Sequence, residues 1–194
     1  MNDHVFIHST AVVDEGCLIG EGTKVWHFTH LMSRAIIGND CIIGQNVFID
    51  NDVVIGQGVK IQNNVSIYKG VEIKDAVFVG PSVVFTNVIN PRSFVERKNE
   101  FMSTRVCEGA SLGANATIVC GIEIGAFALV GAGAVVTKPV KPFALVYGQP
   151  AQQYGWVSKM GYRLTFNEKG EALCEGNSEA YLLKNDHVYL VPLS

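Results

Sequence analysis

An aliphatic or aromatic residue recurs at every sixth position of this chain from Ile7 to Phe85. With 48% hydrophobic residues overall, such a run has a chance probability of roughly 3 in 100,000 in one reading frame. A six-residue period cannot follow the 3.6-residue repeat of an α-helix, but it fits short strands separated by turns. The repeat therefore predicts an all-β, parallel β-helix. Its anchor positions are Ile7, Val13, Ile19, Val25, Leu31, Ile37, Ile43, Ile49, Ile55, Ile61, Ile67, Ile73, Val79 and Phe85.

The positions two residues before each anchor are also uncharged, from Val5 to Val83. Anchor and preceding position therefore point the same way, as alternate residues of a strand do. Turns rich in Gly, Asn and Asp follow, such as Gly38-Asn39-Asp40. Three hexads, about 18 residues, would close one triangular coil, and neighbouring coils would stack about 4.8 Å apart to bury their inner faces.

The repeat stops after Phe85 and resumes at Val106, so residues 86–105 are expected to leave the helix as a long loop. The loop is polar and charged, and Pro91 after Asn90 favours an extended path. A loop of this length without its own structure is uncommon unless it is functional or disordered. We therefore expect function here.

The domain organisation follows from where the repeat ends. We expect a β-helix over residues 1–147, with its strands ending near the prolines of Lys138-Pro139-Val140-Lys141-Pro142, because proline disrupts strand pairing. Residues 148–194 should form a small β-rich or helical extension, in which Trp156 to Tyr162 could be a short helix or a cap. Strands are expected at 162–166 and 187–191, and the extension should cover the open end of the helix.

Composition narrows the classes of function. A formal net charge of −3 without a basic run argues against nucleic-acid binding. No hydrophobic stretch is long enough to span a membrane, and the N-terminus lacks a signal-peptide pattern, so a soluble, cytoplasmic protein is expected. Five cysteines without a C-x-x-C pair are best explained as core residues, as at Cys17 and Cys41. Cys174 and His187 alone do not make a metal site, and no metal is expected.

If the loop only bulges from one corner, the residues two after the anchors of one face stack in a column, here called the Asn87 column. An amide, two lysines and the basic loop above them form a plausible anion site, although a solvated corner is the plainer alternative. The column contains Ser33, Asn51, Lys69, Asn87, Cys120 and Lys138.

Two histidines lie outside this column. His27 should stack with Gln45 and Asn63 at another corner, and His30 should lie on an outer face in line with Phe48. Either could enter a site from a neighbouring subunit. For His27, the role of a hydrogen-bonded histidine at a subunit interface is a simpler explanation than the role of a general base.

Several motifs resemble known families. The anchors, with Gly113-Ala114-Asn115-Ala116-Thr117-Ile118, resemble the hexapeptide acyltransferases, which are left-handed β-helices, usually homotrimers, that use acetyl-CoA. Val25-Trp26-His27-Phe28, Phe85-Thr86-Asn87, Asn90-Pro91-Arg92 and Gly155-Trp156-Val157-Ser158 are similar to the N-acetyltransferases that modify the 3-amino group of UDP-2-acetamido-3-amino-2,3-dideoxy-glucuronate for O-antigen and lipopolysaccharide synthesis.

The resemblance implies roles for particular residues. Pantetheine would run along the helix edge between two subunits towards Asn87, the predicted catalytic residue. Arg92 and Arg97 would contact the UDP diphosphate or the sugar carboxylate, since a guanidinium matches planar oxyanions. The full predictions are Asn87, Arg92, Arg97, Lys69 and His30 for the substrate and Cys120, Ala132, Lys138 and Lys141 for acetyl-CoA. Where the family usually has Gly-Asn-Pro-Ala-Arg, this chain has Gly148-Gln149-Pro150-Ala151-Gln152, and the absence of the arginine puts one CoA-phosphate contact in doubt.

In the expected reaction the amine attacks the thioester, while Asn87 orients it and backbone N–H groups stabilise the oxyanion. No general base shares the Asn87 column, and Cys120 as a covalent acyl carrier is a minor alternative. Other hexapeptide acetyltransferases remain open. A gamma-class carbonic anhydrase would need a third histidine beside His27 and His30, and a non-catalytic scaffold would need no long basic loop.

Overall fold

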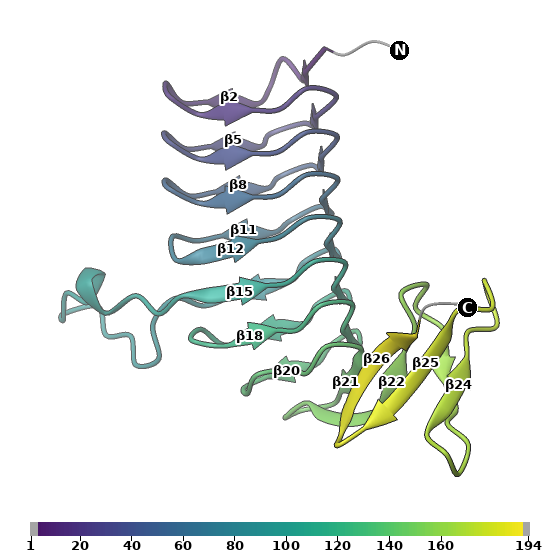
Figure 1. Ribbon diagram of the computed structural model, residues 1–194. Coiled ribbons are helices and arrows are strands. Elements are labelled where there is room, and N and C mark those ends of the chain that lie inside the picture. The colour runs from purple at the N-terminus through teal and green to yellow at the C-terminus, as the bar shows by residue number, and fades with distance from the viewer. Residues whose placement is uncertain (1–3, 192–194) are drawn as a thin grey trace.

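The computed structural model describes residues 4–191 and forms a left-handed parallel β-helix of about eight coils, as the hexad repeat predicts (Figure 1). Each coil contributes one short strand to each of three parallel sheets. The second sheet, here called sheet B, contains β2 (Val12–Val13), β5 (His30–Leu31), β8 (Phe48–Ile49), β11 (Ser66–Ile67), β14 (Val84–Phe85), β17 (Thr117–Ile118) and β20 (Val135–Val136).

The other two parallel sheets complete the triangular prism. Sheet A runs from β1 (Phe6–Ile7) through β4 (Lys24–Val25), β7 (Ile42–Ile43), β10 (Lys60–Ile61), β13 (Phe78–Val79), β16 (Ser111–Leu112) and β19 (Leu129–Val130) to β21 (Ala144–Tyr147). Sheet C contains β3 (Leu18–Ile19), β6 (Ile36–Ile37), β9 (Val54–Ile55), β12 (Val71–Ile73), β15 (Thr104–Val106) and β18 (Glu123–Ile124).

The core follows the anchors. From Val25 to Val136 every anchor is at most 2% exposed. The first coil differs: Ile7 is 44% exposed, because no coil lies on its outer side. Between strands the third residue after an anchor often has a positive φ, as at Arg34 (61°) and Asp52 (62°), which closes the corner sharply.

Strand pairing continues past the prolines at which we expected it to end, as far as Tyr147. Pro139 and Pro142 lie in turns, Val140 forms a parallel bridge with Ile124, and β21 pairs in parallel with β19. The prolines are accommodated because they occupy positions between strands, where no ladder hydrogen bond is needed.

The C-terminal segment turns back and covers the last coil (Figure 1). Antiparallel strands β22 (Gln152–Val157) and β23 (Arg163–Leu164) extend sheet A, so the alternative of a short helix from Trp156 is wrong. A three-stranded sheet follows, formed by β24 (Glu171–Leu173), β25 (Ala180–Lys184) and β26 (His187–Val191). Its Tyr181 ring meets Phe143 edge-on at 5.8 Å, and Phe143 stacks on Phe127 at 5.3 Å between centroids.

Candidate functional site

The Asn87 column forms at the corner between sheets B and C. Strand pairing aligns Leu31 with Ile49 and Ile67, and Phe85 with Ile118, which aligns with Val136. The residues two positions later therefore stack from coil to coil, as the sequence predicted.

The loop leaves and rejoins the helix at this corner (Figure 1). It spans residues 86–103, because β15 already begins at Thr104. Its base is closed by a hydrogen bond from the Met102 N–H to the Asn87 carbonyl, 3.0 Å long. Thr86 Oγ1 accepts from the Cys120 N–H at 3.0 Å. These bonds fix the backbone at Asn87, whose half-buried side chain makes no hydrogen bond within the described residues.

The loop contains the 3-10 turn η1 (Lys98–Glu100) and two predicted substrate-binding arginines. Arg97 donates from Nη1 to Glu100 at 2.7 Å, while its Nε is buried without a hydrogen-bond partner. Arg92 is exposed and donates to the Pro91 carbonyl at 2.9 Å. Arg92 is thus not paired with a carboxylate within the described loop, whereas Arg97 already is.

Towards the N-terminus, two cations share one carboxylate at this corner. Asp52 accepts from Arg34 Nε at 2.6 Å and Nη2 at 3.2 Å, and from Lys69 Nζ at 2.7 Å. Hydrogen bonds from Arg34 and Lys69 hold the pKa of the Asp52 carboxyl well below its usual range. Lys69, a predicted substrate contact, is therefore already in an ion pair.

The structure places the histidines outside the column, as expected. His30 lies on the outer face of sheet B, and its Nε2 is 3.1 Å from Oδ1 of Asp14. His27 stacks against His8 with 3.6 Å between ring centroids, at the corner between sheets A and B. A hollow of about 310 Å³ beside it is lined by Gln45 and Asn63 among others.

The predicted cofactor residues do not all meet on one chain. Lys138 is exposed in the Asn87 column and Cys120 is buried there, which argues against a covalent acyl-Cys120 step. Lys141 forms an ion pair with Asp186. Ala132 follows β19, so it lies at the corner between sheets A and B, whereas Lys138 lies at the corner between sheets B and C.

Sequence reasoning missed a groove that runs beside the column. A hollow of about 420 Å³ is lined by Gly70, Ser103, Thr104, Gly121 and Pro139 among others. It shares Pro139 with a hollow of about 140 Å³ that Lys138, Lys141 and Gln152 help to line. Charged side chains line it as well, namely Glu72, Arg105 and Glu123. Its glycines keep one side open: a Cβ at Gly121, where φ is 85°, would lie 2.5 Å from the Met102 methyl group. Part of the signal was available, since Gly70, Gly121 and Pro139 follow the column by one position.

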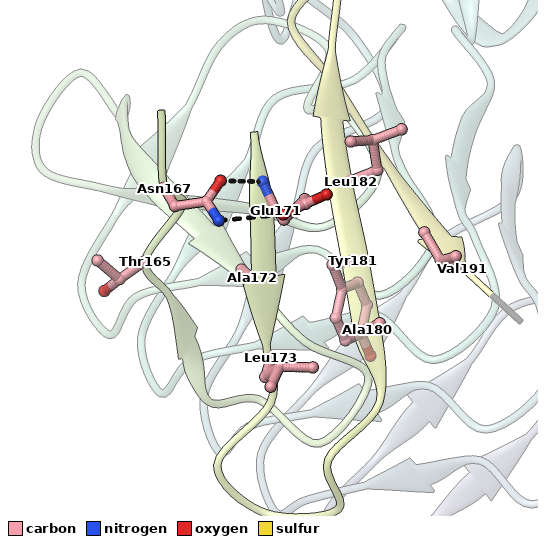
Figure 2. A pocket seen from close by; sticks show the side chains of 9 residues that line it. All are labelled: Thr165, Asn167, Glu171, Ala172, Leu173, Ala180, Tyr181, Leu182 and Val191. Carbon is pink, nitrogen blue, oxygen red and sulfur yellow. Dashed lines mark hydrogen bonds between the residues drawn. The ribbon is translucent and has the colours of Figure 1, made fainter. Parts of the chain in front are cut away.

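A larger hollow lies elsewhere. It measures about 580 Å³ beside β24 and β25, where Asn167 and Glu171 hydrogen-bond each other and apolar side chains such as Leu173 and Leu182 also line it (Figure 2). It sits in the C-terminal sheet at the far end of the helix from the N-terminal coils, whereas the loop leaves mid-helix (Figure 1). We place the candidate site at Asn87 because the column, the loop and the groove converge there.

Two general features complete the description. Among residues 4–191, no three His, Cys, Asp or Glu side chains are grouped so that they could hold a metal ion. No helix within the same residues is long and apolar enough to cross a lipid bilayer.

Family models match the repeats. Residues 16–51 and 52–87 match the bacterial transferase hexapeptide (six repeats), and residues 34–69 and 104–138 match the hexapeptide repeat of succinyl-transferase. The chain therefore belongs to the hexapeptide-repeat acyltransferases, an enzyme family, which confirms the resemblance at that level.

A full-length relative supports the same assignment. The chain is 45% identical over 170 residues to the dTDP-3-amino-3,6-dideoxy-alpha-D-galactopyranose 3-N-acetyltransferase of Aneurinibacillus thermoaerophilus, covering 88% of this chain and 87% of the relative. The glucuronate-specific family that the motifs resemble is not singled out by this match.

Solved structures share the fold. A hexapeptide-repeat acetyltransferase of Vibrio cholerae O1 biovar eltor, complexed with acetyl-CoA, superposes with a TM-score of 0.54 at 25% identity over 61% of this chain and 68% of that one. The acetyltransferase domain of PglB from Neisseria gonorrhoeae FA1090 gives 0.52 at 19% identity over 79% of this chain and 58% of that chain, less than two thirds of its length.

Proposed function

We propose that this protein transfers an acetyl group from acetyl-CoA to the 3-amino group of a nucleotide-linked amino sugar. The observation that carries the proposal is the interruption after Phe85, which fixes Asn87 at the base of a basic loop and beside a groove that Gly70 and Gly121 help to line. The relative of Aneurinibacillus thermoaerophilus is named for 3-N-acetylation, which supports the position of the acceptor amine.

The groove suggests how the two substrates approach. Acetyl-CoA would lie along the C-terminal part, with its phosphates near Lys138 and Lys141 and its thioester next to Asn87. Lys141 would have to exchange Asp186 for phosphate. Because the thioester end occupies the groove up to Asn87, the acceptor must arrive from the N-terminal side of the same edge, over Lys69 and the loop.

The chemistry needs positioning more than acid–base residues. The neutral 3-amino group attacks the thioester carbonyl, the carbon–sulfur bond breaks, and CoA leaves as the thiolate. The ammonium proton passes to that thiolate or to water. The Asn87 side-chain oxygen can accept a hydrogen bond from the amine and so orient its lone pair. Backbone N–H groups at the corner can donate to the oxyanion, each worth about 2.7–4 kcal/mol in known sites.

The loop is the proposed contact for the nucleotide. Arg92 is the first candidate for the diphosphate, because it has no carboxylate partner in the described loop. Arg97 would bind the sugar nucleotide only if it released Glu100, and His30 would do so only if it released Asp14. A homotrimer would bring Ala132 and His27 of one subunit towards the Asn87 column of the next, which is why we keep that assembly as part of the proposal.

Two acceptors fit the coarse activity. The motifs resemble enzymes for UDP-2-acetamido-3-amino-2,3-dideoxy-glucuronate, whereas the 45% identical relative is named for dTDP-3-amino-3,6-dideoxy-galactose. Both carry a 3-amino group and a nucleoside diphosphate. They differ in the nucleoside, at C-2, where the first bears an acetamido group and the second a hydroxyl, and at C-5, where the first bears a carboxylate and the second a methyl group. Either product would suit lipopolysaccharide or O-antigen synthesis.

The direct test is mass spectrometry of reactions that contain the purified protein, acetyl-CoA and a panel of UDP- and dTDP-linked amino sugars. We expect a gain of one acetyl group on 3-amino sugars and release of free CoA thiol. Controls are 2-amino and 4-amino isomers, and galactosides that offer only hydroxyl groups. Acetylation of hydroxyl acceptors alone, or of none of the panel, would refute the proposal. Failure of both acetyl-CoA and sugar nucleotide to raise the melting temperature would favour a scaffold.

A further inference from the structure

We infer that Asp52 makes the acceptor site selective for sugars without a carboxylate, such as 6-deoxy sugars, by neutralising Arg34 and Lys69, two cations on the N-terminal side of Asn87 at the same corner. The inference rests on the proposed function and specifies its substrate class. It starts from where the acceptor must lie: on the N-terminal side of Asn87, where the column continues with Lys69 and Asn51.

Both cations of this region, Arg34 and Lys69, already form ion pairs with Asp52. Arg34 and Asp52 are third after their anchors on successive coils, so the guanidinium reaches the carboxylate through two hydrogen bonds of 2.6 and 3.2 Å. Lys69 Nζ reaches the other side of the same carboxylate at 2.7 Å. A sugar carboxylate that sought either cation would have to displace Asp52 first.

A second carboxylate strengthens the effect. Asp50 accepts from the backbone N–H of Lys69 at 3.2 Å and from that of Asn51 at 2.8 Å. Both bonds hold Asp50 against the column. The cluster thus contains two cations and two carboxylates with no net charge, and an incoming carboxylate would meet two negative groups without a free positive one.

The neighbouring surface is suited to a methyl group. A hollow of about 140 Å³ on the outer side of β11 and β14 is lined by Tyr68, Val84, Ser66 and Asn64 among others. Val84 is 48% exposed and lies on the strand that ends two residues before Asn87. An exposed valine and an aromatic ring offer apolar contact to a C-5 methyl group, and among residues 4–191 no cation lines the hollow to pair with a carboxylate.

The remaining free charge is needed elsewhere. In the described loop and the Asn87 column, Arg92 and Lys138 are the cations without a carboxylate partner. The sugar nucleotide already brings a diphosphate and acetyl-CoA brings its own phosphates. These two cations can serve those groups, which leaves none for a further carboxylate.

The test compares kcat/KM for two acceptors that differ at C-5 alone, a dTDP-linked 3-amino-3,6-dideoxy sugar and the dTDP-linked 3-amino uronic acid that carries a carboxylate in place of its methyl group. We expect the wild-type protein to prefer the neutral sugar at least tenfold. Asp52→Asn should release Arg34 and Lys69 and raise kcat/KM for the carboxylate sugar at least tenfold, mainly through KM. Asn tolerates the positive φ of 62° at this position.

Controls separate charge selection from folding. Asp40→Asn makes the same charge change at a turn with φ of 56° on another corner, and it should leave the ratio of the two acceptors unchanged. If Asp52→Asn melts early, Asp52→Gly replaces it, because Gly16, Gly70 and Gly121 occupy equivalent corner positions with positive φ. Adding both Arg34→Met and Lys69→Met to Asp52→Asn should cancel the gain.

The outcomes are distinguishable. A wild-type preference for the carboxylate sugar, or an unchanged ratio in the folded Asp52 variants, overturns the inference and leaves the proposed N-acetyltransferase standing. If no 3-amino sugar nucleotide is acetylated, the proposed function itself fails and the inference falls with it.

Discussion

Asn87 combines a fixed backbone with an unpaired side chain. The Asn87 backbone carbonyl accepts a hydrogen bond from the Met102 N–H, and the neighbouring Thr86 hydroxyl accepts one from the Cys120 N–H. The side-chain amide of Asn87 makes no hydrogen bond within the described residues. A half-buried amide held in this way is ready to bind a ligand without reorganising, and pre-ordering of that kind is what a positioning mechanism requires.

We therefore expect Asn87→Ala to lower kcat at least tenfold, about 1.4 kcal/mol of transition-state stabilisation, with the assembly unchanged. The bonds at the loop base involve backbone groups, so they survive the substitution. Steady-state kinetics and light scattering check the two halves of this prediction. Asn39→Ala is the matched control, since Asn39 occupies the same position in a coil at a different corner. Near-normal turnover in Asn87→Ala would remove Asn87 from the mechanism.

At this scale the sequence placed the residues but not their partners. The hexad frame aligned Lys69 with Asn87, because strand register is set by the repeat. It did not reveal that Asp52 forms ion pairs with both Lys69 and Arg34. These contacts depend on the direction that long side chains take from a corner with positive φ, which the repeat does not specify. The groove was missed because the prediction stopped at the second residue after each anchor, whereas Gly70, Gly121 and Pro139 are the third.

Among the elements, the loop and the C-terminal segment show which parts of the fold the sequence pattern could predict. The loop was predicted from the break in the repeat, and only its end differs, because Thr104 and Arg105 pair with Val71 and Glu72. The strand at 187–191 was predicted well by its alternation. The possible helix at Trp156 was wrong because β22 pairs with β21, a tertiary contact that local composition does not encode.

The C-terminal sheet is attached through a buried tyrosine. Tyr181 is 1% exposed, accepts from the Lys159 N–H at 3.0 Å and donates to Glu179 at 2.7 Å. Burial, together with Glu179, raises the pKa of Tyr181 to about 12. Since the unfolded chain would ionise near pH 10, the protonated form stabilises the fold fully below pH 10 and loses this contribution as the pH rises towards 12.

We expect Tyr181→Phe to lose less stability than the wild-type protein between pH 10 and 12, although it starts from a lower value because the Lys159 and Glu179 bonds are gone. Urea unfolding across this pH range measures the slope. Tyr189→Phe, at a site 53% exposed on β26, is the control and should follow the wild-type slope. Equal slopes for all three proteins would contradict the burial argument.

On the scale of the whole molecule, stability should vary along the stack of coils. Each coil contacts its neighbours alone, so an inner coil has two partners and the first coil one. Ile61 is fully buried in the middle of sheet A, whereas Ile7 in the equivalent position of the first coil is 44% exposed.

Ile61→Ala should therefore lower the free energy of unfolding by about 2–5 kcal/mol, and Ile7→Ala by about 1 kcal/mol or less. Denaturant unfolding of the two variants gives the comparison, with the same residue type removed from the same sheet. If both variants lost the same stability, the first coil would have to be covered in solution, for example by another subunit.

The way the loop rejoins the helix has an evolutionary consequence. The chain returns to the corner it left, and β14 and β17 keep their ordinary register on either side of the excursion. Insertions here need not alter the pitch, and each doubling of loop length adds only about 0.6 kcal/mol of closure entropy. A lineage can thus exchange this stretch, and with it the proposed sugar contacts, while the coils on either side keep their register.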